Sequence, residues 1–286
     1  MGSKIDLHIH TRFSDGSDSA RELAEKIAAA GIRMFSVTDH DTVEGIAAME
    51  PLVPEGTVFI PGVEFSCISP LGKCHILGYG FDRRHPALLE ALEEGRRLRL
   101  DKLERRLEKL RLDFGIELDS REKQWLRSLS SPGKPHLGRI LLERGLGASL
   151  DECIGKYLKR PSLGRDRIDA ADAIAAITAA GGISVWAHPL GGEGERRLTA
   201  DDFEAQLAWL TGCGLGGMEC WYSRYSMEEV DFLLGRAGGL VITGGSDYHG
   251  SNKHNLELGM LNRENLPARL EAEPLTRLLK NGIICK

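Results

Sequence analysis

The chain has 286 residues, of which 42% are hydrophobic and 28% charged, so it can bury a sizeable core and should be soluble. Its net charge of −5 argues against binding of extended nucleic acid. No apolar run approaches the ~18 residues of a membrane span, and the first residues lead into a strand without a signal peptide. The six cysteines show no C-x-x-C spacing and are expected to be reduced thiols of a cytoplasmic protein.

The first predicted strand, residues 4–11, alternates apolar and polar side chains. Because side chains alternate between the faces of a strand, one face should be apolar and the other should carry Asp6, His8 and His10. Two imidazoles on one strand can bind the same metal ion, and the neighbouring carboxylate of Asp6 can fix the tautomer of a ligand. The pattern therefore predicts a metal site, and its alternative is a solvated polar face on an edge strand.

Strands and helices alternate after this segment. A turn-rich loop precedes a helix that Ser19 or Asp18 can cap and that ends at Gly31. A second strand, 34–38, ends in Asp39-His40-Asp41-Thr42. A third strand is expected at 58–66 and carries Glu64 in its apolar run, and a turn at 70–73 should return the chain through 75–78 as a hairpin. Polar groups at strand ends are typical of sites in parallel α/β folds.

The composition changes between residues 83 and 165. A strongly charged helix is predicted over 84–111, with leucines near helical spacing, and further helical sequence continues to about residue 159. We interpret 83–165 as an inserted helical subdomain. Its charge run is interpreted as a solvated face.

The α/β alternation resumes at Asp169, whose carboxylate is expected to cap an Ala-rich helix. Three further strands are predicted at 183–187, 217–221 and 240–243, and a final helix near 273–281 should precede a short closing strand. Six or seven strands alternating with helices favour a closed or nearly closed barrel.

Nine ionisable side chains follow or interrupt these strands, and they include six of the nine histidines in the chain. Imidazole and carboxylate without thiolate suit Zn²⁺, Mn²⁺ or Fe²⁺, and nine groups exceed the ligands of one ion. Taken singly, Asp15 is also consistent with a turn residue and His75 with a core histidine. Taken together they predict two or three bound divalent ions. The candidate ligands are His8, His10, Asp15, His40, Glu64, His75, His188, Asp247 and His249.

The order of these groups resembles the PHP (polymerase and histidinol phosphatase) family. The motifs that carry the resemblance are His8-x-His10, Ser14-Asp15-Gly16, Thr38-Asp39-His40-Asp41, Glu64, His75, His188-Pro189 and Ser246-Asp247-Tyr248-His249-Gly250. The resemblance implies a distorted (β/α)7 barrel, formed by 1–82 and 166–286, with 83–165 as a helical cap. It also implies three ion sites: His8, His10, Glu64 and Asp247; bridging Glu64 with His75 and His188; and Asp15, His40 and His249.

The family resemblance implies hydrolysis of phosphate esters, for which we expect a metal-bridging hydroxide as nucleophile and Glu64, Asp247 and His188 as catalytic groups. Lys134-Pro135-His136 stands where similar proteins have Arg-Pro-His, and Arg160 stands where they often have a basic residue. Lys134, His136 and Arg160 are therefore the candidates for binding substrate phosphate, and Arg139 and Arg165 are weaker ones. A solvated loop residue remains the alternative for Lys134, and a helix cap remains the alternative for His136.

The leading hypothesis is a phosphoesterase acting on a nucleotide or sugar phosphate. The alternatives are a cyclic phosphodiesterase that opens a ring ester and also removes the phosphate, a histidinol phosphatase, and an amidohydrolase-like enzyme that cleaves C–N bonds. From a different class comes a proofreading or binding module related to DNA polymerase PHP domains. The sequence leaves open which ester is cleaved, which metal is bound and the oligomeric state.

Overall fold

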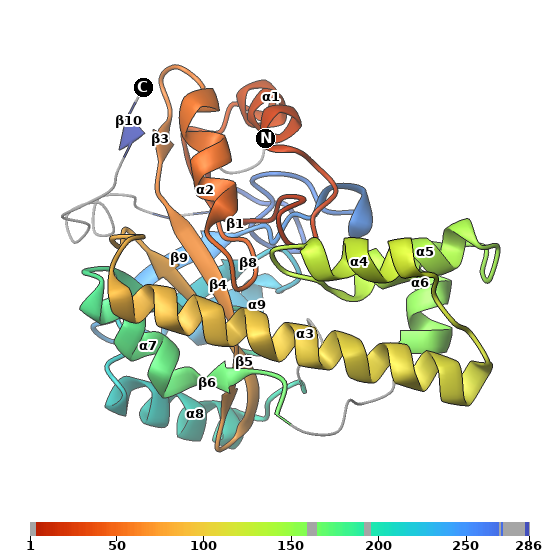
Figure 1. Ribbon diagram of the computed structural model, residues 1–286. Helices are drawn as coiled ribbons and strands as arrows, with labels where there is room; N and C mark the ends of the chain where they lie inside the picture. The colour runs from red at the N-terminus through yellow and green to blue at the C-terminus, as the bar shows by residue number, and fades with distance from the viewer. Residues whose placement is uncertain (1–3, 159–164, 192–195, 269, 271–283, 286) are drawn as a thin grey trace.

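A computed structural model of the chain describes residues 4–158, 165–191, 196–268, 270 and 284–285 (Figure 1). Its strands form two mixed sheets. The first sheet, in the order β1-β2-β3-β10, contains β1 (Ile5–Ile9), β2 (Met34–Val37), β3 (Val58–Phe59) and β10 (Ile284–Cys285). The second, in the order β6-β4-β5-β7-β8-β9, contains β4 (Gly62–Ser69), β5 (Gly72–Tyr79), β6 (Ile168–Asp169), β7 (Ile183–Trp186), β8 (Gly217–Tyr222) and β9 (Val241–Gly245).

The described helices lie around and beside these sheets (Figure 1). They are α1 (Ala20–Ala30), α2 (Glu44–Met49), α3 (Pro86–Phe114), α4 (Ser120–Ser128), α5 (Lys134–Glu143), α6 (Leu150–Cys153), α7 (Ala170–Ala179), α8 (Ala200–Gly212) and α9 (Met227–Leu234). Short 3-10 helices cover Glu50–Leu52 and Gly250–Asn252, and a π-helical turn covers Ile154–Leu158. Among the described residues, no helix combines the length and apolar character needed to cross a membrane.

Backbone hydrogen bonds join the two sheets at two seams. At the first, Asp247 N donates to His8 O at 2.8 Å and His10 N donates to Tyr248 O at 2.9 Å, which places β1 beside the end of β9. At the second, Asp41 N donates to Glu64 O at 2.9 Å. Each seam is an isolated bridge and not a strand ladder. The described strands are therefore two sheets in contact and not one closed barrel.

The single strand expected at 58–66 is divided at Pro61. Proline has no backbone N–H to donate to a sheet ladder, so the chain changes partners there. β3 pairs in parallel with β2, whereas β4 pairs antiparallel with β5, as the predicted hairpin requires. This change of partner places Glu64 at the boundary between the two sheets.

An apolar cluster connects the sheets, with members on strands of both: Leu7, Met34, Ile60, Leu77, Tyr79, Val185, Ala187 and Val241. The main core contains Ile9 instead of Leu7 and includes the buried faces of α1, α7, α8 and α9. The apolar residues of β1, which were expected on one face, are thus divided between two clusters. A register shift between Asp6 and Ile9 in the pairing with β2 interrupts the simple alternation.

Two predicted helix caps have different outcomes. The Ser19 side chain accepts a hydrogen bond from Glu22 N at the start of α1, and Gly31 ends this helix with φ 68°, as predicted. The Asp169 side chain does not cap α7. Its carboxylate instead pairs with Arg165 at 3.2 Å, because a guanidinium on the same surface competes with the helix N–H groups.

Helix α3 contributes to two separate apolar clusters. Leu88, Leu92 and Leu98 belong to the main core. Leu103, Leu107 and Leu110 of α3 pack with α4, α5 and α6, at the far end of α3 from α7 (Figure 1). The final helix predicted near 273–281 lies outside the described residues.

Candidate metal centre

The structure brings the nine candidate ligands together around Glu64. Glu64 Oε2 lies 2.9 Å from His40 Nδ1, 3.2 Å from His10 Nε2 and 3.3 Å from His8 Nε2. Its other oxygen, Oε1, lies 2.8 Å from His75 Nδ1 and 3.2 Å from His188 Nε2. One carboxylate thus contacts five imidazoles: one on β1 and one directly after it, one each from the segments that follow β2 and β7, and one from β5 of the β4–β5 hairpin.

The remaining three candidates lie at the edge of this group. Asp247 Oδ1 is 3.2 Å from His10 Nε2, and Asp15 Oδ1 is 3.1 Å from His249 Nε2. Most of these side chains are fully buried, but that of Asp15 is 18% exposed and that of His40 12%. The cluster is therefore open to solvent on the side of Asp15 and His40.

Several buried polar atoms in the cluster have no hydrogen-bond partner in the part of the chain that the structure describes: His8 Nε2, His10 Nε2, Asp15 Oδ1, His40 Nδ1 and Glu64 Oε2. Such atoms are costly unless something binds them, so their convergence fits metal ions. Three sets have ligand atoms within 4.8 Å of one another: His10, Asp15, His40 and His249; His8, His10 and Asp247; His40, Glu64 and His75. The nitrogen and oxygen donors suit Zn²⁺, Mn²⁺ or Fe²⁺. How the ligands divide among ions stays a prediction.

Burial and neighbouring charges shift the pKa values of the cluster residues in different directions. Burial raises the pKa of Glu64, but the surrounding histidines outweigh it and bring the pKa well below its ordinary value. Burial lowers the pKa of His10, yet the nearby carboxylates of Asp247 and Glu64 outweigh it and bring the pKa to about 9. Burial lowers the pKa of His40 to about 4 despite the nearby carboxylates. A metal ion would replace the extra proton on His10, whereas His40 is already neutral at pH 7 and ready to bind one.

Glu219 was not predicted as a site residue. It lies on β8 and is completely buried. His8 Nδ1 donates to Glu219 Oε1 at 3.0 Å, and the His188 backbone N–H donates to Oε2 at 2.8 Å. The carboxylate thus fixes the tautomer and orientation of His8. The sequence feature that could have identified Glu219 is an acidic residue within an apolar strand, as at Glu64.

Two other buried carboxylates hold the loops that carry ligands. Asp39 accepts hydrogen bonds from Thr11 Oγ1 and Ser14 Oγ, both at 2.6 Å, and so fixes the loop before Asp15. Asp6 accepts from Ser246 Oγ at 2.6 Å and Gly259 N at 2.8 Å. The suggestion that Asp6 orients a ligand imidazole is therefore wrong, because its oxygens are used to hold the loop of Asp247.

The predicted phosphate-binding residues have different surroundings. Lys134 is the first residue of α5, and the preceding Gly133 lies against Asp15. His136 Nδ1 accepts a hydrogen bond from Gly133 N at 3.0 Å, which is the helix-capping alternative. Arg139 donates to Asn252 Oδ1 at 3.0 Å. Arg160 lies outside the described residues, and Arg165 forms surface ion pairs with Asp169 and Glu94.

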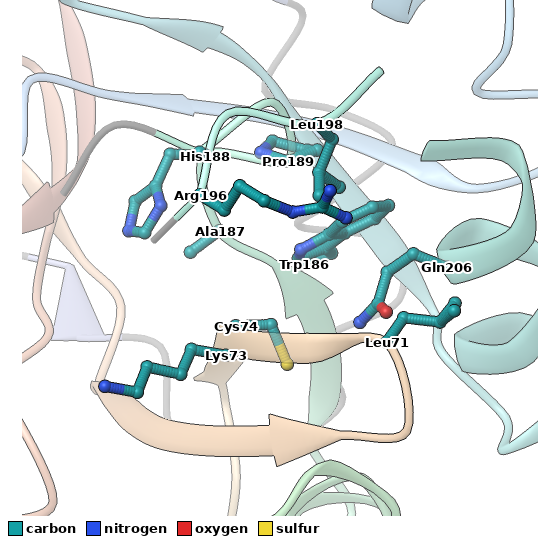
Figure 2. Close-up of a pocket in the computed structure, with 11 residues that line it drawn as sticks. Leu71, Lys73, Cys74, Trp186, Ala187, His188, Pro189, Arg196, Leu198 and Gln206 are labelled. Atoms are coloured by element: carbon teal, nitrogen blue, oxygen red, sulfur yellow. The ribbon is translucent and has the colours of Figure 1, made fainter. Parts of the chain in front are cut away.

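Two hollows lie next to the cluster. A small pocket of about 20 Å³ beside His188 is lined by Lys73 and Arg196, which were not predicted. Figure 2 shows the Lys73 side chain extending from the hairpin toward the side on which the His188 ring lies. A larger groove of about 520 Å³ is lined by Gly16, Trp125 and His136. Cationic side chains therefore line the pocket beside His188, and an aromatic ring lines the larger groove.

Comparison with known families gives one match over more than half of the chain: residues 6–159 match the PHP domain. A phosphoribosyl 1,2-cyclic phosphate 1,2-diphosphodiesterase from Eggerthella lenta is 31% identical, over 86% of this chain and 94% of its own length. A 3′,5′-nucleoside bisphosphate phosphatase from Chromobacterium violaceum is 28% identical, over 93% of each. The 5′-3′ exoribonuclease Rnm of Escherichia coli is 31% identical, over 85% of this chain and 84% of its own.

Solved structures agree with this relationship. A candidate metal-dependent phosphoesterase from Bifidobacterium adolescentis superimposes with a TM-score of 0.77 at 26% identity, covering 92% of this chain and 94% of its own. An amidohydrolase from Chromobacterium violaceum, solved with sulfate and without metal, superimposes with a TM-score of 0.80 at 25% identity, covering 99% and 98%. The resemblance seen in the sequence motifs is confirmed, and the chain belongs to the PHP domain family.

Proposed function

We propose that this protein is a metal-dependent phosphoesterase that hydrolyses a small phosphorylated metabolite, either a nucleotide or a sugar phosphate. The observation that carries the proposal is the group of five imidazoles around Glu64, flanked by Asp15, Asp247 and His249, in a PHP family member. Buried nitrogen and oxygen donors in this number suit two or three divalent ions of manganese, zinc or iron.

We further propose that 1–82 and 166–286 form a distorted (β/α)7 barrel and that 83–165 is its helical cap. The apolar cluster shared by both sheets, together with the bridges at the two seams, supports the barrel. The separate apolar cluster of α3 to α6 supports the cap. The free thiols of the described cysteines support a cytoplasmic location.

The chain's own residues divide into holding and binding groups. Bound divalent ions would lower the pKa of water and neutralise phosphoryl oxygens, which phosphate ester hydrolysis requires at neutral pH. Glu64, Asp247 and His188 face the centre of the cluster and are the proposed catalytic group, while Glu219 and Asp39 keep the ligands in position. The substrate phosphate approaches from the open side, where Asp15 meets the N-terminus of α5 and Lys134.

A cyclic phosphodiesterase activity is the second candidate, since the Eggerthella relative acts on a cyclic phosphate at 31% identity over nearly its whole length. Ring opening and phosphate removal would use the same ions. Because some relatives are exoribonucleases, the end of a short RNA is a third candidate substrate. The net charge of −5 provides little attraction for an extended strand.

The test is a substrate screen with protein loaded with Mn²⁺, Zn²⁺ or Fe²⁺. It compares phosphate release from nucleoside and pentose phosphates, ring opening of a pentose 1,2-cyclic phosphate, shortening of a 5′-phosphorylated oligoribonucleotide and cleavage of small amides. Histidinol phosphate is included among the monoesters. We expect hydrolysis of P–O bonds in small esters. Amide cleavage without any P–O cleavage would overturn the proposal.

A further inference from the structure

Arg99 joins α3, part of the segment proposed as the cap, to the border of the candidate metal centre. Arg99 Nε donates to Asp41 Oδ2 at 2.5 Å, and Asp41 follows His40 in the chain. The Arg99 side chain is only 14% exposed and the Asp41 side chain 2%, so solvent screens this ion pair little. A shielded hydrogen bond between a guanidinium and a carboxylate holds both partners in a fixed arrangement.

The same guanidinium also contacts the β4–β5 hairpin. Arg99 Nη2 donates to Ser66 Oγ at 2.7 Å, and Ser66 N donates to Asp41 Oδ1 at 2.9 Å. Ser66 is the strand partner of His75 in the pairing of β4 with β5. Arg99, Asp41 and Ser66 therefore form a closed ring of hydrogen bonds, which we call the Arg99 triad. The triad adjoins His40 along the chain and His75 across the hairpin.

One of the three sets of possible metal ligands, that of His40, Glu64 and His75, lies beside the Arg99 triad. Glu64 Oε2 lies 2.9 Å from His40 Nδ1, and Oε1 lies 2.8 Å from His75 Nδ1. The two histidines come from different sheets, since His40 follows β2 and His75 lies on β5. Their separation therefore depends on contacts that join the sheets at this point. The triad supplies such contacts, together with the hydrogen bond from Asp41 N to Glu64 O at 2.9 Å.

The backbone at Asp41 depends on contacts of this kind. Its φ of 52° lies in the left-handed region, which residues with a side chain rarely adopt and which persists only where the surrounding structure holds it. Both carboxylate oxygens of Asp41 are held by the Arg99 triad. Helix α3 also packs directly on this turn, because a Cβ at Gly95 would lie 3.2 Å from Asp41 Cβ. Arg99 is thus placed to hold the backbone that carries His40.

We propose that Arg99 is a positioning residue of the candidate metal centre, which fixes the spacing of His40 and His75 through Asp41 and Ser66. Arginine suits this role because its planar fork holds two acceptors at fixed angles, whereas the single ammonium of lysine does not. Helix α3 then helps to form the metal centre and does not only cover it. This inference rests on the proposed metal-dependent phosphoesterase function and adds a residue that binds neither metal nor substrate.

The experiment measures metal binding directly. Wild type, Arg99→Gln, Arg99→Lys, Asp41→Asn and the double variant Arg99→Gln/Asp41→Asn are titrated with Zn²⁺ against a chelator of known affinity. The absorption spectrum of each protein loaded with Co²⁺ reports the geometry of the ligands around the ion. Arg97→Gln is the matched control, because Arg97 lies two residues away on α3, is 54% exposed and pairs with Glu94 and Asp101 of the same helix. Thermal unfolding is recorded on the same preparations.

We expect Arg99→Gln to weaken the binding of one ion by about 10- to 100-fold and to change the Co²⁺ spectrum, while any other ion binds as in the wild type. Arg99→Lys should lose a smaller part of this affinity, since it keeps the charge without the fork. Asp41→Asn should weaken the same ion, and the double variant should be little worse than the more severe single one, because both residues act in one network. Arg97→Gln should match the wild type. If Arg99→Gln does not fold, Arg99→Lys decides the test.

An unchanged affinity and an unchanged Co²⁺ spectrum in the Arg99 variants would overturn the positioning role. So would an equal loss of all ions in step with a lower melting temperature, because Arg99 would then stabilise only the fold. Additive losses in the double variant would show that Arg99 does not act through Asp41, which also overturns the proposal. No substrate is used in these measurements. A wild type that binds ions as expected but cleaves no phosphate ester would therefore overturn the phosphoesterase function alone.

Discussion

Glu219 and His8 form a buried pair in which His8 Nδ1 donates to Glu219 Oε1 at 3.0 Å. Because this hydrogen bond occupies one ring nitrogen, the other, Nε2, is directed at Glu64 and Asp247. Glu219 also accepts a hydrogen bond from the His188 backbone N–H, so this one carboxylate positions two of the candidate ligands, His8 and His188. The metal affinity of the cluster should therefore depend on a residue that contacts no ion.

Replacing Glu219 with Gln should lower metal affinity by about 10- to 100-fold, because the neutral amide holds the His8 tautomer less firmly. The measurement is competition for Zn²⁺ against a chelator of known affinity. Glu204→Gln, on the exposed surface of α8, is the control and should bind metal as the wild type does. An unchanged affinity in Glu219→Gln would contradict the positioning role.

Glu64→Gln should abolish most activity while leaving the fold intact. Glu64 contacts five imidazoles, so the substitution removes the negative charge at the centre of the cluster. The apolar clusters that stabilise the sheets are unchanged. We expect kcat to fall by several orders of magnitude. Steady-state kinetics and thermal unfolding on the same preparation test this, and a folded variant with near-normal turnover would refute it.

Lys102 should make the protein more stable as the pH rises from about 7 toward 10.5. Its pKa is about 7 in the fold, mainly because of burial, against an ordinary value of 10.5, so the unfolded chain binds the extra proton in this range. The free energy of unfolding then increases by at most ~1.4 kcal/mol per pH unit. Lys102→Met removes this contribution, so urea unfolding at pH 7, 8 and 9 should show the difference between wild type and variant shrinking. Parallel curves would show that the pKa of Lys102 is not lowered.

Gly245→Ala should destabilise the protein by about 3 kcal/mol or more. A Cβ at this position would lie 2.1 Å from His8 Cβ and 2.6 Å from His8 N, and the backbone of β1 has no room to move. Gly239→Ala is the control, because a Cβ there meets nothing within 4 Å. Urea unfolding of both variants measures the difference, and equal stabilities would mean that β1 and β9 are further apart than described.

Lys134→Ala should lower kcat/KM by about 10- to 100-fold without changing metal content, because Lys134 is proposed to bind phosphate and not metal. The same expectation applies to Arg160. Lys109→Ala, at an exposed position on α3, is the control. Kinetics and elemental analysis on the same preparations measure both quantities, and an unchanged kcat/KM would show that Lys134 does not bind the substrate phosphate.

The position of the candidate metal centre along the chain was determined by the sequence. The candidate ligands follow short apolar strands, and local alternation with capping residues such as Ser19 and Gly31 locates those strands without knowledge of the fold. The β4–β5 hairpin was predictable for the same reason, since its turn residues are adjacent in the chain. The sequence motifs also carried the family resemblance.

Only the tertiary structure decided what surrounds these residues. Glu219 meets His8, and Arg99 meets Asp41, across 211 and 58 positions of the chain, so neither pair leaves a local pattern. At Pro61 the chain passes from pairing with β2 to pairing with β5, and these two partners lie in different sheets. The Asp169 carboxylate pairs with Arg165 and does not cap α7. The burial of Lys102 and Arg106 likewise depends on the packing of α3 beside β6, since a charged helix in the sequence cannot be distinguished from a solvated one.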